Sequence, residues 1–593
     1  MSIRRFSSMP RPDDSKDYLE RLVRSIDDEA QDRLRDFDIL RIQNVPWVDV
    51  RTYGAVGDGV TDDTDAINDA IESLQVTQSA VKSNQYTYHD CPSVGYVYFP
   101  PGHDFVISTP ILVETDHSDT SNRVFSDAIH LVGYGARIIA KSTFAGASRY
   151  YDADNEETLT AMVIMGVKSY GKYSGHLQCY NKILGLTFDG SNVTADLSGI
   201  NLDVVYHTQI QDCIFDNLHK CITGRVIHLP QISNCQAVYC NSFYYSNNNS
   251  EALGWNSNNG LDSGGPIISN VNCHFSKNNT DNATYNAIGK IHLVNVGEEL
   301  VSNVKIMGDN GIGIYKEYDA SSKQHYRWGN YSNIEIAGMY YYAVHLKHTT
   351  QVNFSNCLFV WNQVQGHDAT DRPAVYLEDV KRINMSNFTI DQDVASKHCA
   401  QLLLVTGGGC HFSNFKAFGQ PHDDDTYECI RVADGANYAG DYNIFSNFEA
   451  GHLYYSSGNK YSLGARVASG TNYNQFIDAH ITNCGTACVY LDDALTTNKA
   501  INITTDESID VASASTITLP DYGDYFNITG TTNITSVNPS WIGRRVVLKF
   551  AAILTFTDGS NLKLAGNFAT SADDTITLVG DGTSWYEESR SAN

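Results

Sequence analysis

A short motif recurs along the middle of this chain and constrains its fold more than any other feature. Between residues 233 and 448, Ser-Asn followed by an apolar residue or Cys occurs eight times. The asparagines are Asn234, Asn270, Asn303, Asn333, Asn356, Asn387, Asn414 and Asn447, and Asp212 and Asp478 hold the equivalent place one repeat earlier and later. A repeat of roughly 20–50 residues is typical of a solenoid, in which each unit packs on its neighbours.

The residues on both sides of the asparagine predict short strands. Apolar and polar side chains alternate in Val344–Leu346 upstream and in Ile334–Ile336 downstream, and this alternation buries one face of a strand. Asparagine tolerates the left-handed conformation of a corner, and stacked side-chain amides can hydrogen-bond to one another. The sequence therefore predicts an all-β fold, a parallel β-helix.

Several residues beside the motif have simple structural interpretations. Lys305 is followed one repeat later by Glu335, and Lys416 by Glu449, so both pairs should form surface ion pairs worth under about 1 kcal/mol. The thiols at the position after the corner, Cys213, Cys235 and Cys357, should be small core side chains.

Composition excludes several classes of protein. The formal net charge of −27 argues against nucleic-acid and anionic-membrane partners. No run of 18 apolar residues predicts a membrane span, and Met1–Pro12 lacks the apolar core of a signal peptide. The 13 cysteines include no CxxC pair and no zinc-like spacing, which indicates reduced thiols and folding in a cytoplasm. We expect no metal and no cofactor.

The two ends of the chain differ from the repeats. Residues 1–44 contain one convincing helix, over 13–40, whose short heptad seam fits a trimeric coiled coil, a helix docked on a partner, or a helix packed on its own domain. Residues 499–593 lose the asparagine motif and show short strands with Asp558-Gly559 and Asp581-Gly582 turns. They predict a small antiparallel β domain for trimer clamping or a second sugar contact.

A distinctive segment opens the repeats. Asp49–Ile67 predicts a strand, a Gly-rich turn and a helix with Asp and Thr at its start, and Val97–Gly102 predicts a return strand closed by Pro-Pro-Gly. The helix would cover the open end of the solenoid. Its carboxylates are expected to cap the helix and brace the turn, although they could be mistaken for catalytic groups.

This segment closely resembles the opening of pectate-lyase-like β-helix proteins, especially bacteriophage tailspikes and capsule depolymerases. The resemblance implies a right-handed parallel β-helix over residues 45–498, usually a homotrimer. It also implies a protein made in the host cytoplasm and mounted on the virion, with its N-terminus attached to a tail or baseplate protein. Its ligand would be a bacterial surface polysaccharide.

The motifs of related enzymes assign no catalytic residue. Asn201-Leu202-Asp203 fits the first part of the polygalacturonase signature, but the chain has no Gly-His-Gly and no matching Arg-x-Lys. The Arg-x-Pro-x-x-Arg signature of calcium pectate lyases is also absent, as are a G-x-S-x-G elbow, a P-loop and H-E-x-x-H.

Geometry then supplies the candidates. Glycosidic hydrolysis usually needs two carboxyls about 5 Å or about 6.5–9.5 Å apart, and neighbouring β-helix coils lie about 4.8 Å apart. We predict Glu317 and Glu378 as the catalytic pair and keep Asp319 and Asp371 in reserve. Glu317, Asp319 and Asp371 are expected to lie in loops beside the strands. One outward column should carry His292, His345, Tyr376, Arg431 and Arg466, and the next should carry Lys347 and Glu378. The predicted sugar-binding residues are Trp255, Trp328, Trp361, His345, Tyr376 and Arg431.

Other sites and functions stay open. The loop from Asn241 to Pro266 could complete a groove, and His422–Asp425 is expected to be solvated rather than a cation site. A lyase would use His345, Tyr376 and Lys347 in place of the glutamates. A non-catalytic receptor-binding spike and a purely structural tail protein are the alternatives. The missing signatures and signal peptide oppose a secreted pectin-type enzyme.

Overall fold

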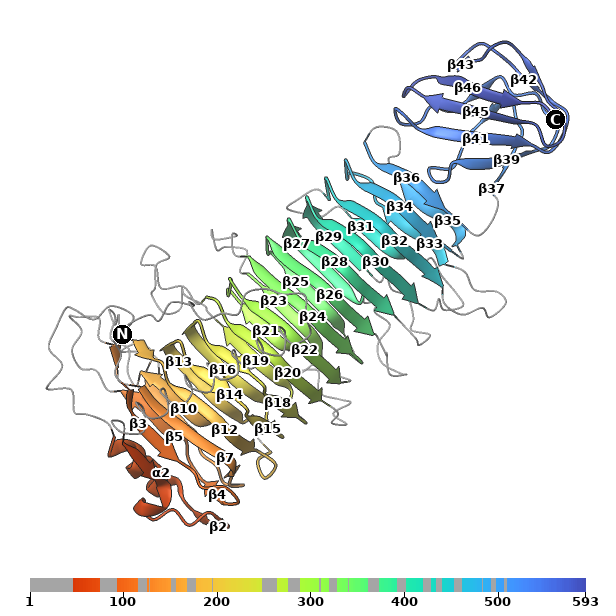
Figure 1. Ribbon diagram of the computed structural model, residues 1–593. Coiled ribbons are helices and arrows are strands. Elements are labelled where there is room, and N and C mark those ends of the chain that lie inside the picture. The colour runs from red at the N-terminus through yellow and green to blue at the C-terminus, as the bar shows by residue number, and fades with distance from the viewer. Residues whose placement is uncertain are drawn as a thin grey trace, which may run out of the picture.

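The computed structural model describes most of the chain as one long rod. The described residues are 46–74, 93–115, 125–126, 128–150, 156–167, 177–194, 196–247, 264–275, 288–308, 311–318, 328–339, 341–360, 373–391, 402–419, 428–433, 440–452, 461–482, 484–491, 497–505 and 509–593. Stacked strands form a solenoid, and a separate small β domain lies at its C-terminal end (Figure 1). The predicted helix within residues 1–44 lies outside the described residues.

Two parallel sheets form the walls of the solenoid. We call them sheet A and sheet B, and each coil contributes strands to both. In the repeats, sheet A contains β20 (Ile267–Phe275), β22 (Leu300–Gly308), β24 (Gly329–Ala337), β26 (Val352–Val360), β28 (Asn384–Asp391), β30 (His411–Gly419), β32 (Ile444–His452), β34 (Gln475–Ile481) and β36 (Lys499–Thr504). Sheet B contains β13 (Ser198–Tyr206), β16 (Lys220–His228), β19 (Ser242–Asn247), β21 (Gly289–Val294), β23 (Ile312–Glu317), β25 (Tyr342–Lys347), β27 (Val375–Lys381), β29 (Leu402–Gly408), β31 (Glu428–Ala433), β33 (Tyr461–Val467) and β35 (Cys484–Leu491).

The N-terminal coils are less regular. They add β1 (Trp47–Asp49), β2 (Asp58–Asp62), β3 (Ser93–Tyr98), β4 (Asp104–Ile107), β7 (Ala128–Ala140), β12 (Lys182–Asp189), β14 (Gln209–Gln211), β15 (Ile214–Asp216), β17 (Gln231–Ser233) and β18 (Gln236–Val238) to sheet A. They add β5 (Ile111–Thr115), β6 (Phe125–Ser126), β10 (Ala161–Val167) and β11 (Leu177–Cys179) to sheet B. A hairpin of β8 (Ala147–Tyr150) and β9 (Glu156–Leu159) is separate from both sheets. The predicted right-handed parallel β-helix is confirmed.

The recurring asparagine bends each long strand of sheet A. The motif residues have φ of 50–57°, the left-handed region that asparagine tolerates. Their side chains form a ladder: the Nδ2 of Asn333 donates to Oδ1 of Asn303 at 2.9 Å, and the Nδ2 of Asn303 donates to Oδ1 of Asn270 at 3.1 Å. The motif does not stop at Asp478 as the sequence suggested. Asn502 continues the ladder, with Nδ2 2.6 Å from Asp478 Oδ1, but lacks the preceding Ser that identifies the motif.

Side chains stack inside and outside the coils as the repeat predicts. Phe388, Phe415 and Phe448 form one buried stack with ring centroids 4.7 and 4.8 Å apart. The predicted core thiols are buried. The surface pairs are also confirmed, with Nζ–carboxylate distances of 2.7 Å for both Lys305–Glu335 and Lys416–Glu449. The periodic part of the sequence therefore specifies a periodic structure.

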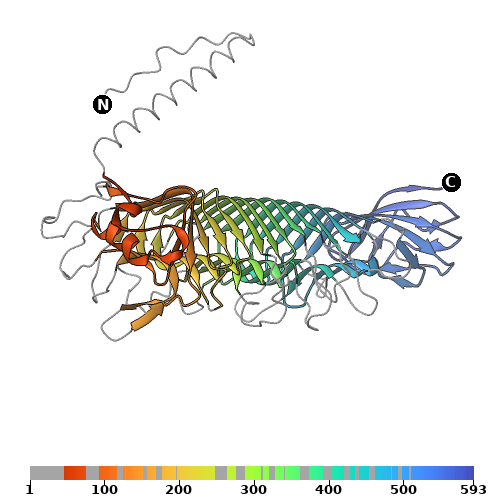
Figure 2. The same ribbon diagram turned by 90° about the horizontal axis from the view of Figure 1, so that it is seen from below.

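A short helix covers the N-terminal end of the solenoid. A 3-10 turn, η1 (Val50–Tyr53), precedes β2, and α2 (Thr64–Glu72) then packs its buried residues on the first coils (Figure 2). The Asp63 carboxylate accepts hydrogen bonds from the backbone N–H groups of Val56, at 2.6 Å, and Gly57, at 3.1 Å. These contacts confirm that this carboxylate braces the turn, but Asp63, at the N-cap of α2, makes no side-chain hydrogen bond that caps the helix.

The C-terminal domain differs from the prediction in two ways. First, β36 (Lys499–Thr504) pairs with β34, so the solenoid extends past residue 498. Second, the domain is mixed rather than purely antiparallel: β37 (Ile509–Ala512), β39 (Tyr525–Thr529) and β41 (Arg545–Phe550) pair in parallel, whereas β41, β45 (Thr575–Gly580) and β46 (Trp585–Ser591) pair antiparallel. The glycine-containing turns predict hairpins, in which neighbouring strands pair antiparallel. They do not show how strands joined by longer connections pair.

The remaining strands complete this domain. They are β38 (Thr516–Ile517), β40 (Ser536–Val537), β42 (Thr555–Phe556), β43 (Leu562–Lys563) and β44 (Phe568–Ala569). The domain has its own apolar core, built around the buried Trp585, and Tyr522 and Trp541 pack against the core of the solenoid. No helix among the described residues is long and apolar enough to cross a membrane.

Candidate functional site

Two rows of outward side chains run along sheet B. The first row, which we call the ring row, passes in register through Asn201, Thr223, Tyr245, His292, Tyr315, His345, Tyr376, Leu403, Arg431, Arg466 and Tyr490. The second, the charged row, passes through Asn247, Val294, Glu317, Lys347, Glu378 and Val405. The register therefore places the predicted residues His345, Tyr376 and Arg431 in one row, beside the row that holds both predicted glutamates.

Aromatic and imidazole rings stack along the centre of the ring row. Centroids lie 4.6 Å apart for His292 and Tyr315, 4.8 Å for Tyr315 and His345, and 4.7 Å for His345 and Tyr376. Tyr245 continues the row at the other end, with its ring edge to face against His292 at 4.8 Å and 81°. These spacings match the distance between neighbouring coils, about 4.8 Å, so the rings keep the spacing of the strands that carry them.

Glu317 is held by two members of the ring row. The Tyr315 hydroxyl donates to its Oε2 at 2.5 Å, and Nε2 of His292 lies 3.9 Å from its Oε1. The His292 ring and then the Tyr315 hydroxyl hold the pKa of Glu317 below its usual range. Burial and this carboxylate raise the pKa of Tyr315, so at neutral pH the glutamate is ionised and the phenol keeps its proton.

Glu378 has the same kind of surroundings two coils later. Nε2 of His345 lies 3.5 Å from its Oε2, and Nζ of Lys347 lies 3.7 Å from its Oε1. His345 and then Lys347 lower the pKa of Glu378, whereas burial lowers the pKa of His345 itself and raises that of Tyr376 to about 12. At neutral pH this part of the site offers a carboxylate, a neutral imidazole and an ammonium group.

The two glutamates do not lie on neighbouring coils. Glu317 ends β23 and is not the loop residue that the sequence suggested, because the strand runs one residue further than the apolar pattern shows. Lys347 lies between it and Glu378 in register. Two coil steps place their backbones about 10 Å apart, close to the upper end of the separation in inverting glycosidases and beyond the 5 Å of retaining ones. Both side chains are about 30% exposed and accessible to a ligand.

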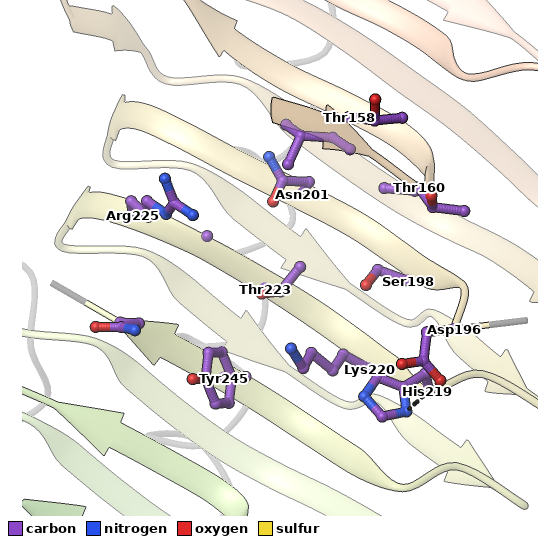
Figure 3. Close-up of a pocket in the computed structure, with 14 residues that line it drawn as sticks. Thr158, Thr160, Asp196, Ser198, Asn201, His219, Lys220, Thr223, Arg225 and Tyr245 are labelled. Carbon is purple, nitrogen blue, oxygen red and sulfur yellow. Dashed lines mark ion pairs between the residues drawn. The ribbon is translucent and has the colours of Figure 1, made fainter. Parts of the chain in front are cut away.

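A hollow of about 400 Å³ lies at the N-terminal end of the two rows (Figure 3). Hydroxyl, amide and charged side chains line it together with an imidazole and a phenol ring: Thr158, Thr160, Asp196, Ser198, Asn201, His219, Lys220, Thr223, Arg225, Tyr245 and Asn247. Nζ of Lys220 lies 4.1 Å from the centre of the Tyr245 ring. His219 Nδ1 is 3.5 Å from Asp196 Oδ1, and burial lowers the pKa of His219 to about 4 despite that carboxylate. This composition suits hydroxyl-rich ligands.

A buried ion pair lies directly behind Glu317. Lys316 points inward from β23, and its Nζ is 2.5 Å from Oε1 of Glu299, with both side chains fully buried. The Tyr331 hydroxyl also donates to that oxygen at 2.8 Å. Gly329 leaves room for the carboxylate, because a Cβ there would collide with Glu299 Oε1. The pair fixes the strand that presents Tyr315 and Glu317.

The other predicted site residues are placed differently. Trp328 is exposed, but it precedes β24 and so belongs to sheet A. Asp319, Asp371, Trp255 and Trp361 lie outside the described residues, as do most of the loop from Asn241 to Pro266 and the His422–Asp425 cluster. Within the described part of the chain, no three His, Cys, Asp or Glu side chains group closely enough to hold a metal ion.

Sequence reasoning missed Tyr315 and Tyr245, two of the three tyrosines in the stretch of the ring row from Tyr245 to Tyr376, and found the third, Tyr376. The coils of the two missed tyrosines contain polar residues at inward or irregular positions, such as Lys316, so the alternation that reveals an outward column is interrupted. It also missed the hollow, apart from the Asn201-Leu202-Asp203 fragment. Asn201 lines the hollow and its Nδ2 donates to Asp203 Oδ2 at 3.0 Å.

Comparisons with known proteins agree with this architecture. Residues 47–292 match the family described as rhamnogalacturonase A/epimerase, pectate lyase-like. Tailspike protein 3 of bacteriophage CBA120 has a similar structure, with a TM-score of 0.51 and 13% identity, over 82% of this chain and 64% of that one. The fold is a pectate-lyase-like β-helix of the kind found in a phage tailspike. The expected resemblance is confirmed for the fold, and this chain spans under two thirds of the tailspike's own length.

Other similar structures are more distant. The A-module of the Azotobacter vinelandii mannuronan C-5 epimerase AlgE6 matches with a TM-score of 0.40 and 11% identity, over 78% of this chain and 99% of that one. DFA-IIIase of Arthrobacter chlorophenolicus A6 matches with a TM-score of 0.41 and 13% identity, over 73% and 94%. Among curated protein sequences, none matches this chain. The family match ends at His292, so it includes the hollow and stops before Tyr315.

Proposed function

We propose that this β-helix is a phage tailspike that binds and depolymerises a bacterial surface polysaccharide, a capsule, exopolysaccharide or O-antigen. The observation that carries the proposal is the pair of outward rows on sheet B, where stacked rings lie beside ionised, partly exposed carboxylates. The fold shared with a phage tailspike supports the setting on a virion tail. Attachment through the N-terminal segment and assembly of three copies are further parts of this proposal.

The rows suit a long sugar polymer rather than a compact ligand. The outer edges of the tyrosine rings offer apolar surface beside pyranose rings, and the hydroxyl and amide groups of the hollow accept hydrogen bonds from sugar hydroxyls. Tyr245 lies in both the ring row and the lining of the hollow, so a chain of sugars can continue from one to the other.

Hydrolysis is the reaction that we assign first. The ionised Glu378 would take a proton from a water molecule that attacks the glycosidic carbon, and Glu317 would protonate the departing oxygen. A sugar that covers Glu317 would remove water from it and raise its pKa, which a general acid requires. The two-coil separation favours inversion over retention.

A lyase is the second candidate, because the neutral imidazole of His345 lies beside Lys347 and Glu378. His345 could abstract the proton next to a uronate carboxylate while Lys347 stabilises the negative charge that develops. This reaction needs a uronic acid in the glycan and leaves an unsaturated sugar.

Incubation of the purified protein with polysaccharide from candidate host strains separates these functions. New reducing ends without ultraviolet absorbance from an unsaturated sugar would indicate hydrolysis, and new ends with that absorbance would indicate elimination. A glycan that binds tightly but is never cut would leave a non-catalytic receptor-binding spike. Failure to bind any host polysaccharide would overturn the proposal. Light scattering tests the homotrimer, for which we expect three times the chain mass of 65.5 kDa.

A further inference from the structure

The ring row continues beyond its stacked centre into a cluster of positive charge. Arg431 on β31 and Arg466 on β33 follow Tyr376 in register, and Tyr490 on β35 follows them. We call Arg431, Arg466, Tyr490 and the buried Glu428 the arginine cluster. It lies on the same outward face of sheet B as the two glutamates, at the C-terminal end of the rows.

One carboxylate serves both guanidinium groups. NH1 of Arg466 is 3.1 Å from Oε1 of Glu428, and NH1 of Arg431 is 3.7 Å from its Oε2. The Glu428 side chain is only 7% exposed, whereas that of Arg431 is 42% exposed. Two guanidinium groups therefore share this one carboxylate in the ion pairs of the described residues.

Arg431 is the more loosely held of the two arginines. Its contact with Glu428 is longer than a hydrogen bond, and its Nε is buried with no hydrogen-bond acceptor among the described residues. The Nε lies below the surface, so a ligand would meet the exposed part of the side chain, which is 42% exposed as a whole. A guanidinium offers a planar fork of donors that matches a carboxylate or a phosphate.

The neighbouring ring completes a sugar site. Tyr490 is 45% exposed, and the guanidinium carbon of Arg466 lies 6.0 Å from its centre. A pyranose on this ring would place its substituents near the arginines. Two coil steps, about 10 Å, separate Arg431 from Tyr376, so a glycan bound along the stacked rings can reach the cluster.

We propose that the arginine cluster binds a negatively charged substituent, a carboxylate or a phosphate, of the glycan that lies along sheet B. The inference rests on the proposed function and narrows the substrate to an acidic polysaccharide. The chain as a whole carries a formal charge of −27 and repels such a polymer. A localised positive site on the sugar-binding face would offset that repulsion and fix the register of the bound chain.

Titration of the full-length protein tests the cluster directly. The probes are glucuronate and glucose 6-phosphate, with glucose as the neutral control, and binding is followed by ligand-observed NMR. We expect the acidic sugars to bind at least about tenfold more tightly than glucose, and Arg431→Gln to remove that preference, because charge-assisted hydrogen bonds are lost. Arg466 remains to pair with Glu428 in this variant, so it should fold. Tighter binding of glucuronate would indicate that the cluster binds a carboxylate, and tighter binding of glucose 6-phosphate would indicate that it binds a phosphate.

Two comparisons make the test specific. Arg431→Lys keeps the charge but loses the planar fork, so it should bind acidic sugars with intermediate affinity. Lys305→Gln removes a cation from sheet A and should leave the preference unchanged. Equal binding of acidic and neutral sugars by the native protein, or an unchanged preference in Arg431→Gln, would overturn the inference. A protein that prefers glucuronate but cuts no polysaccharide would instead refute the depolymerase function.

Discussion

The two sheets of each coil follow opposite rules. At the corner of sheet A, the same side chain returns turn after turn, and most of the asparagines donate a hydrogen bond to the one before. On the outward face of sheet B, successive coils present different side chains at the same place, from His292 through Tyr315 to Arg431. Repetition on sheet A stabilises the stack, whereas variety on sheet B creates distinct positions for a ligand.

The first way to test this comparison is to remove a carboxylate from each sheet. Glu317→Gln and Glu378→Gln should each reduce the depolymerisation rate about 10²–10⁴-fold, the usual contribution of general acid–base catalysis, with little change in the free energy of unfolding. Glu335→Gln, on sheet A, removes a carboxylate of similar exposure and should leave the rate unchanged. If either sheet B variant kept the native rate, that glutamate would not be catalytic, and the hollow would be the next candidate for the catalytic site.

The second test concerns the buried pair behind the site. Lys316→Met leaves the Glu299 carboxylate buried without its cation, which should lower the free energy of unfolding by about 3–5 kcal/mol. The double variant Glu299→Gln with Lys316→Met removes both charges and should recover much of that loss. Urea denaturation measures both. Equal destabilisation by the single and double variants would show that packing, not charge, dominates at this position.

Much of sheet A could be predicted from the sequence because its signal is repeated. One Ser-Asn motif identified the corners, their ladder and the outward ion pairs, but it missed Asn502, where the serine is missing, and the buried ladder of Asn443, Asn474 and Asn498. The cap over the first coil was also predictable, because Asp63 lies in a distinctive segment with a known structural role. In both cases a local pattern specifies a local contact.

The candidate site was only partly predictable, for a physical reason. Its residues come together through register, which depends on how many residues each intervening loop contains. His345, Tyr376 and Arg431 were placed correctly because their strands alternate cleanly, whereas Tyr315 was missed because Lys316 interrupts the alternation. The presence of one coil between Glu317 and Glu378 could be recognised only once the register of the sheet B strands was known. The hollow depends on several coils and a hairpin, which no single motif encodes.

The third test uses pH to compare histidines on the two sheets. Burial lowers the pKa of His219 to about 4, whereas the unfolded value is about 6.5. Between these values the unfolded chain binds a proton that the folded chain does not, so stability should fall as pH falls from about 6.5 to 4, by at most about 3 kcal/mol. His219→Gln should flatten this dependence. The same substitution at His480, on sheet A, gives the general effect of removing a histidine, and a pH dependence that His219→Gln leaves unchanged would contradict the assignment to His219.

The smallest effect should come from a single step of the asparagine ladder. Asn333 has φ of 54° and takes part in two ladder hydrogen bonds, at 2.9 Å to Asn303 and 3.3 Å from Asn356. Asn333→Ala should lower the free energy of unfolding by about 2 kcal/mol, because it loses these bonds and strains the left-handed backbone. Asn333→Gly loses only the bonds and should be destabilised less. Neither variant should alter the depolymerisation rate, because the ladder stabilises the rod but does not contact the proposed glycan. A slower rate in Asn333→Gly would show that the two sheets are not independent.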